Sequence, residues 1–176
     1  MNKHIILLRG VMPFGKNKVP MAALREVLEN AGLNDVQTYI QSGNVIASSG
    51  LSQAALERTV HEVIVEKFGG DIAVLARTPA YFKDALAQNP FAGADSTKLY
   101  FTLLSSVPEP GLLQAFLAPG YAPDKIAVVD DMAYVQCATK YSDLKINNNF
   151  IERKLRIAAT TRVYNTITKL VELSES

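Results

Sequence analysis

The first chemically suggestive segment is a loop near the N-terminus that is rich in glycine and lysine. It reads Gly10-Val11-Met12-Pro13-Phe14-Gly15-Lys16-Asn17 and follows an apolar run that predicts a strand. The spacing is that of a phosphate-binding P-loop, but Asn17 stands where that motif needs a hydroxyl group to bind magnesium. We therefore expect a looser anion site, in which backbone N–H groups and Lys16 or Lys18 hold the ligand. A solvated, lysine-rich surface loop is the alternative interpretation.

A second polar segment lies near the C-terminus. Thr160 and Thr161 are expected to begin a final helix, Arg162–Leu173, whose polar face carries Arg162, Asn165 and Lys169. A guanidinium group at a helix N-terminus suits phosphate or carboxylate, because its planar donors reach two oxygens. A plain solvent-facing helix surface is the alternative.

The two basic ends of the chain are expected to meet in one site. Residues 1–25 carry five basic and no acidic residues, and residues 140–169 carry seven basic and two acidic ones, although the net charge is only +1. A hairpin turn adds polar side chains between them. The predicted ligand-binding residues are Arg9, Lys16, Asn17, Lys18, Gln41, Ser42, Asn44, Arg162, Asn165 and Lys169.

No acid–base pair, nucleophile or metal cluster can be recognised among the other polar residues. His61 lies four residues after Glu57 on a predicted helix, which indicates a surface pair, and its spacing from His4 is not that of metal ligands. The single cysteine, Cys137, stands in an apolar strand and is expected to be a core residue. Ser42 has no evident base. We expect no metal and no cofactor, and whether the protein is an enzyme stays open.

The elements that must position these residues fall into two similar series. Strands, helices and turns are predicted in the order β-α-β-β-α-β over residues 1–77, and again, without the last strand, over residues 98–176. The predicted fold is α+β, with two ferredoxin-like (split β-α-β) halves, mostly antiparallel sheets and helices packed on one face. Residues 78–97 are expected to form a connecting helix and loop.

The composition bounds the class of protein. The chain has 176 residues, of which 48% are hydrophobic and 20% charged, as in globular proteins. The short apolar run Ile5–Leu8 is followed by Arg9, so neither a signal peptide nor a membrane span is expected. A lone cysteine excludes an internal disulfide. We expect a cytoplasmic protein that has no membrane contact, and its oligomeric state is left open.

Three segments together resemble a known bacterial family. They are Leu7–Val19, Thr38–Val45 and Ala159–Leu170. Together they resemble the domain-of-unknown-function family DUF1697, and the resemblance covers nearly the whole chain. The resemblance implies no activity, cofactor or catalytic residue. Met12-Pro13-Phe14 departs from the Asn-Val-Gly usual in that family, and Val163-Tyr164 from the usual Asn-Trp.

The expected function is the binding of a small phosphorylated or carboxylated ligand. One alternative is an RNA-binding module, because ferredoxin-like sheets form RNA-recognition domains. Such sheets use aromatic stacking platforms, and the strands His4–Leu8 and Val45–Ser48 have none. A protein-interaction or structural role is the other alternative.

Overall fold

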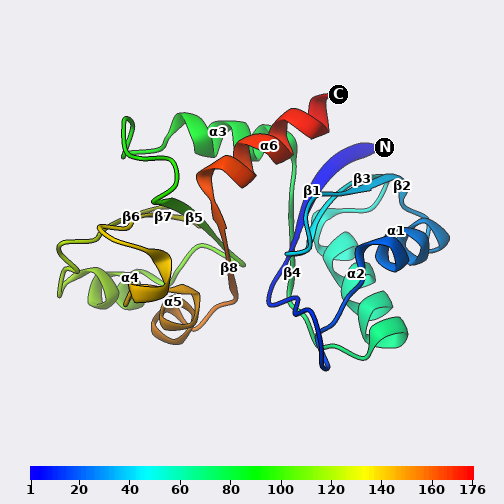
Figure 1. Ribbon diagram of the computed structural model, residues 1–176, viewed down its shortest axis with the longest axis horizontal. Coiled ribbons are helices and arrows are strands. Elements are labelled where there is room, and N and C mark those ends of the chain that lie inside the picture. Colours follow the sequence, from blue (N-terminus) through cyan, green and yellow to red (C-terminus); the bar gives the residue numbers. More distant parts are fainter. The chain divides into compact units, whose positions relative to one another are not determined.

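The computed structural model describes residues 1–176, which form two compact units (Figure 1). Unit 1 comprises Met1–Asp84 and Lys169–Ser176, and unit 2 comprises Ala85–Thr168. Each unit holds one four-stranded antiparallel sheet with helices, so the predicted α+β fold is confirmed. The predicted division into a half at residues 1–77, a connection at 78–97 and a second half at 98–176 stays a prediction.

Unit 1 follows the predicted order of strands and helices. Its elements are β1 (Asn2–Leu8), α1 (Met21–Asn30), β2 (Asn34–Thr38), β3 (Asn44–Ser49), α2 (Gln53–Phe68), β4 (Val74–Arg77) and α3 (Pro79–Ala87), which runs into unit 2. The strand order is β2-β3-β1-β4. This order, with helices after the first and third strands, is the split β-α-β arrangement.

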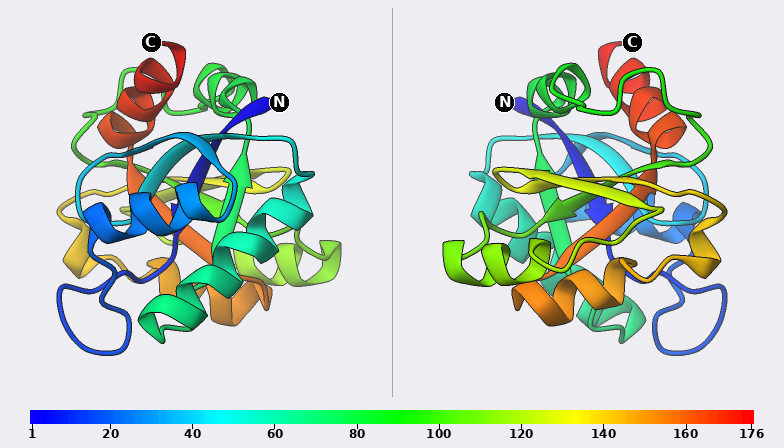
Figure 2. Two further views of the ribbon diagram at one scale, coloured as in Figure 1. Left: turned by 90° about the vertical axis from the view of Figure 1, so that its right-hand side faces the viewer. Right: turned by 90° about the vertical axis from the view of Figure 1, so that its left-hand side faces the viewer.

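The core of unit 1 lies between the sheet and helices α1 and α2. Ile6 of β1 pairs with Val45 of β3 on one side and with Ala76 of β4 on the other, and all three side chains are buried. Leu24 and Leu56 are fully buried helix residues of the same cluster. Figure 2 (left) shows α1 and α2 side by side in front of this sheet. The apolar residues of both helices therefore lie on the face that packs against the sheet.

Local signals set the ends of α2. The Ser52 hydroxyl accepts a hydrogen bond from the backbone N–H of Ala55 at 3.3 Å, which satisfies one donor of the first turn. At the other end Gly69 has a left-handed conformation, and its N–H donates to the Val65 carbonyl at 3.0 Å. The helix thus ends where Gly69 and Gly70 follow it in the sequence.

Unit 2 repeats the same arrangement. Its elements are β5 (Leu99–Leu104), α4 (Pro110–Leu117), β6 (Lys125–Val129), β7 (Met132–Gln136), the 3-10 turn Tyr141–Asp143, α5 (Asn148–Leu155), β8 (Ala159–Val163) and α6 (Tyr164–Glu175), which runs into unit 1. The strand order is β6-β7-β5-β8. Phe116, Val135, Ile151 and Cys137 belong to its buried core, as predicted for the cysteine.

Strand β8 corrects the prediction for the C-terminal segment. The sequence suggested that Thr160 and Thr161 begin a helix, but these residues pair with Leu103 and Thr102 of β5. β-branched side chains at Thr160, Thr161 and Val163 favour a pleated strand over the first turn of a helix. The last helix begins only at Tyr164. Unit 2 therefore has the final strand that the sequence appeared to lack.

The outer edges of β4 and β8 are covered by charged side chains. Glu57 Oε2, on α2, accepts a hydrogen bond from the Ala76 N–H at 2.8 Å, and Glu152 Oε2, on α5, accepts one from the Ala159 N–H at 3.0 Å. Arg77 and Arg162 each donate from Nη1 to the carbonyl oxygen of the preceding residue, at 2.7 and 2.9 Å. Both units thus satisfy backbone groups at the unpaired edge of a strand in the same way.

None of the helices has the length and apolar character needed to cross a bilayer.

Candidate functional site

The first loop, residues 9–18, leaves the end of β1 and closes on itself. The Met12 N–H donates to the Asn17 carbonyl at 2.9 Å, and the Lys18 N–H donates to the Gly15 carbonyl at 3.3 Å. Gly15 has a φ of 87°, a left-handed conformation that a residue with a side chain adopts only at a cost. The loop is therefore a defined turn, which the glycine spacing in the sequence anticipated.

Two glycines elsewhere in unit 1 lie in close contact with the first loop or with the end of β1 before it. A Cβ atom at Gly43 would lie 2.8 Å from Leu8 Cβ and 2.9 Å from Val11 Cγ2. A Cβ atom at Gly70 would lie 2.8 Å from the Lys16 carbonyl oxygen. Since no side chain fits at either position without movement, the chain on both sides of the loop packs directly against glycine backbone.

The first loop carries cationic side chains and backbone donors of the kind that can bind an anion. Lys16 and Lys18 are exposed, and neither forms an ion pair with an acidic side chain. The backbone N–H groups of Phe14, Gly15, Lys16 and Asn17 make no hydrogen bond within the protein. Consecutive N–H groups in a glycine-containing turn can bind anions, and adjacent lysine heads strengthen the attraction.

The hairpin turn between β2 and β3 lies beside this loop, but its residues differ in availability. Asn44 is fully buried, and its Nδ2 donates to the Tyr39 carbonyl at 2.9 Å and to Ser42 Oγ at 2.8 Å. Asn44 therefore holds the turn together, which the sequence did not reveal. Gln41 is exposed and lines a hollow of about 420 Å3 together with three residues of the loop, Val11, Met12 and Pro13.

The surroundings of that hollow are apolar. Met12, Phe14 and Ile40 are 49%, 74% and 51% exposed, which is unusual for side chains of this size. Arg9 is half-buried at the start of the loop, and its N–H donates to the Ala73 carbonyl at 3.0 Å. The site thus combines lysine heads with an apolar wall, and it suits a ligand that has both characters.

The residues predicted on the last helix have other roles than expected. Arg162 is buried in β8, and its Nη1 donates to Thr160 Oγ1 at 2.7 Å, so it does not stand at a helix N-terminus. Burial lowers the pKa of its guanidinium group to about 10. Asn165 is exposed on α6, and Lys169 Nζ lies 3.3 Å from Glu172 Oε1. A joint site of Arg162 and Asn165, in unit 2, with the first loop of unit 1 stays a prediction.

The prediction that His61 pairs with Glu57 was wrong. His61 Nε2 lies 2.8 Å from Asp71 Oδ1 on the surface of unit 1, whereas the carboxylate of Glu57 is taken up at β4. Residues four apart lie on one face of a helix, but here each side chain has a closer partner from outside α2. No group of three His, Cys, Asp or Glu side chains is placed to hold a metal ion.

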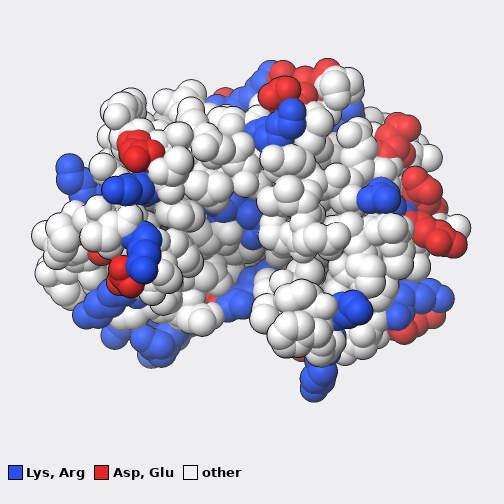
Figure 3. All heavy atoms as spheres, viewed as in Figure 1, with Lys and Arg blue, Asp and Glu red and all other residues white.

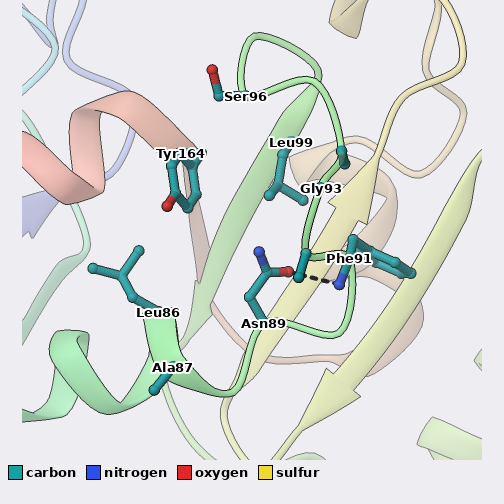
Figure 4. A pocket seen from close by; sticks show the side chains of 10 residues that line it. Leu86, Ala87, Asn89, Phe91, Gly93, Ser96, Leu99 and Tyr164 are labelled. Carbon is teal, nitrogen blue, oxygen red and sulfur yellow. Dashed lines mark hydrogen bonds between the residues drawn. The ribbon is translucent and has the colours of Figure 1, made fainter.

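A hollow of about 260 Å3 in unit 2 was not foreseen (Figure 4). Tyr164 and Leu99 meet Leu86 and Asn89 across it, and the loop that carries Phe91 closes one side. The Asn89 Oδ1 atom accepts a hydrogen bond from the Phe91 N–H at 2.9 Å, so this amide shapes the loop. The hollow contains no charged side chain, and most of its lining comes from residues 78–97, which the sequence predicted only as a connecting helix and loop.

Comparison with known proteins identifies the family. A family model described as "Protein of unknown function (DUF1697)" matches residues 1–134, which include both the first loop and the adjacent hairpin turn. The chain belongs to the DUF1697 family. The resemblance seen in the sequence is thereby confirmed.

A solved structure shares the DUF1697 fold of this chain. It is that of the conserved bacterial protein SP0830 from Streptococcus pneumoniae, with 21% sequence identity over 98% of both chains and a TM-score of 0.79. At this identity the likeness establishes the fold and nothing more. No curated protein matches the chain. The function therefore has to be argued from the residues of the site.

Proposed function

We propose that unit 1 binds a small phosphorylated or carboxylated ligand at the first loop. The observation that carries the proposal is the pair of exposed lysines, Lys16 and Lys18, beside four consecutive N–H groups that have no partner in the protein. An anion supplies acceptors for these donors and offsets the repulsion between the two cations. Because the loop is already folded and packed, little ordering entropy opposes binding.

The apolar wall indicates what else the ligand carries. Met12, Pro13 and Val11 line the hollow beside Gln41, whose amide can both donate and accept hydrogen bonds. A ligand with an apolar or ring portion next to its anionic group would cover the exposed side chains of Met12 and Phe14. Asn17 offers no hydroxyl, so magnesium-dependent P-loop chemistry is not part of the proposal.

The test is a thermal-unfolding screen with nucleotides, sugar phosphates and small carboxylates. A ligand at ~100 times its dissociation constant adds about 2.7 kcal/mol to stability. For a chain of this size that raises the melting temperature by about 5–10 °C. The variant K16Q/K18Q should lose most of this shift while it remains folded.

Lys67→Gln is the matched control, because Lys67 is an exposed lysine of α2 whose only partner is the neighbouring Glu66. It should keep the full shift. Equal shifts for K16Q/K18Q and the unmodified protein would contradict the proposal. If instead only single-stranded RNA binds, with an affinity that falls steeply with salt, the site serves a polyanion and the small-ligand proposal fails.

A further inference from the structure

A second hollow, in unit 2, lies between helices α4 and α5. Its volume is about 450 Å3, and Figure 2 (right) shows the two helices next to each other. Its lining combines aromatic, aliphatic and basic side chains: Leu112, Ala115, Phe116, Pro119, Tyr121, Lys145, Phe150, Arg153, Lys154 and Arg156. No acidic residue is among them. We call it the α4–α5 hollow.

Four cationic side chains surround the α4–α5 hollow. Lys145, Arg153, Lys154 and Arg156 are all exposed, and none forms an ion pair. Figure 3 shows Lys and Arg side chains gathered at the lower left, where Figure 1 places α4 and α5. Like charges this close repel each other, and a bound anion would convert that repulsion into attraction.

The cationic groups are placed by an aromatic ring. Arg153 Cζ, Lys154 Nζ and Lys145 Nζ lie 5.3, 5.5 and 5.7 Å from the centroid of the Phe150 ring, within the range of cation–π attraction. The Tyr121 ring meets Phe150 edge to face, with centroids 5.9 Å apart. Both rings are half-buried, so part of each faces the hollow.

Helix electrostatics account for only part of this cluster. Arg153 and Lys154 stand in the last turn of α5, where the carbonyl ends attract cations. Lys145 comes from the segment before α5 and Arg156 from the residue that follows it, and both still line the same hollow as the aromatic rings. Cations from three positions in the chain therefore lie around the same two aromatic rings, which the attraction of a helix end alone does not explain.

We infer that the α4–α5 hollow binds a ligand in which a phosphate is joined to a flat ring, the chemistry of a nucleotide. The volume is within the range of small-ligand sites. Guanidinium groups bind phosphate oxygens in pairs, and a flat ring stacks on an aromatic or guanidinium plane. The α4–α5 hollow is built from other residues than the first loop, so this inference does not depend on the function proposed above.

The experiment measures by calorimetry the binding of three probes that separate charge from ring. AMP carries both features, adenosine only the ring and inorganic pyrophosphate only the charge. AMP should bind at least tenfold more tightly than either of the others. The variant R153Q/K154Q should weaken AMP binding at least tenfold, because two charged donors are lost. Phe150→Leu, which keeps an apolar side chain, should weaken AMP more than pyrophosphate, because it removes the stacking plane as well as the ring that places the cations.

Two controls make the result specific. Arg58→Gln removes an exposed cation from α2 of unit 1 and should bind AMP as the unmodified protein does. K16Q/K18Q removes the exposed cations of the first loop and serves as the background for every measurement, so that AMP held at the first loop is not counted. Thermal unfolding of each variant checks that it is folded. Failure of AMP to bind in the K16Q/K18Q background, or an AMP affinity there that R153Q/K154Q leaves unchanged, would each overturn the inference. Tight binding of a ten-nucleotide RNA without measurable AMP binding would also overturn it.

Discussion

Arg77 Nη1 lies 3.4 Å from Glu57 Oε2 at the outer edge of β4, and the same carboxylate oxygen accepts the Ala76 N–H at 2.8 Å. Arg77 is only 5% exposed, and Glu57 is half-buried. One carboxylate therefore satisfies both a buried cation and a backbone donor, and it joins α2 to the edge of the sheet.

Glu57→Ala is expected to lower the free energy of unfolding by about 3 kcal/mol, because it leaves a buried cation and an N–H group without this acceptor. The melting temperature should fall by about 6–12 °C. Glu62→Ala, on the exposed side of the same helix, should change stability by less than about 0.5 kcal/mol. Similar melting temperatures for the two variants would show that the Glu57 contacts contribute little.

Gly43→Ala is expected to destabilise the protein more than Gly10→Ala. Both glycines have left-handed backbones, with φ of 89° and 80°, so both substitutions carry a conformational cost of about 1 kcal/mol. Only at Gly43 does the added methyl group meet Leu8 and Val11, whereas nothing lies within 4 Å at Gly10. The contact should cost about 1–3 kcal/mol more, measured as the difference between urea unfolding curves. Equal losses would mean that the first loop moves aside freely.

Asn147→Ala is expected to cost about 1 kcal/mol of stability. Asn147 Oδ1 accepts the Phe150 N–H at 3.0 Å and so caps the first turn of α5. Asn147→Asp keeps an acceptor at the N-terminus and should be nearly neutral. A loss as large for aspartate as for alanine would assign the effect to the second contact, from Asn147 Nδ2 to the Leu144 carbonyl.

Cys137 is expected to react slowly with thiol reagents in the native protein and rapidly in urea. It is 3% exposed, and burial, together with the charge of Asp124, raises the pKa of its thiol to about 11. Only the thiolate is nucleophilic, so both exposure and ionisation oppose the reaction. Labelling of the folded protein at the rate of an exposed thiol would contradict this expectation.

The raised pKa of Cys137 also gives a pH dependence of defined sign. Between about pH 9 and pH 11 the unfolded thiol loses its proton while the folded one keeps it, so stability falls as pH rises. Cys137→Ala lacks this contribution. The stability difference between the unmodified protein and the variant should therefore shift by about 2 kcal/mol toward the variant from pH 8 to pH 11. A constant difference would refute the pKa argument.

Much of the fold could be predicted from local signals. Apolar runs indicated the strands and helices of unit 1, and α2 ends at Gly69, whose left-handed conformation costs glycine little. β8 was missed because Thr160 and Thr161 suit both a helix cap and a strand. Pairing with β5, which joins residues about 60 positions apart, decided between them, and a single sequence does not report such contacts.

The candidate sites were predictable only where they are local. The glycine spacing located the first loop, but the burial of Asn44 and Arg162 follows from tertiary packing. The α4–α5 hollow was overlooked although a signal existed. Arg153, Lys154 and Arg156 follow Phe150 closely in the sequence, but Tyr121 and Lys145 join them only when α4 packs against α5.

The side-chain cover of β4 and β8 bears on how the protein behaves when it is concentrated. An edge strand with unpaired groups is a template on which another chain can add a strand. Glu57 and Glu152 occupy donors that such a strand would need, and they place a negative charge in its path. Variants that neutralise both glutamates would therefore leave backbone donors at the edges of β4 and β8 able to pair with a strand of another chain. We expect such variants to aggregate more readily than the unmodified protein.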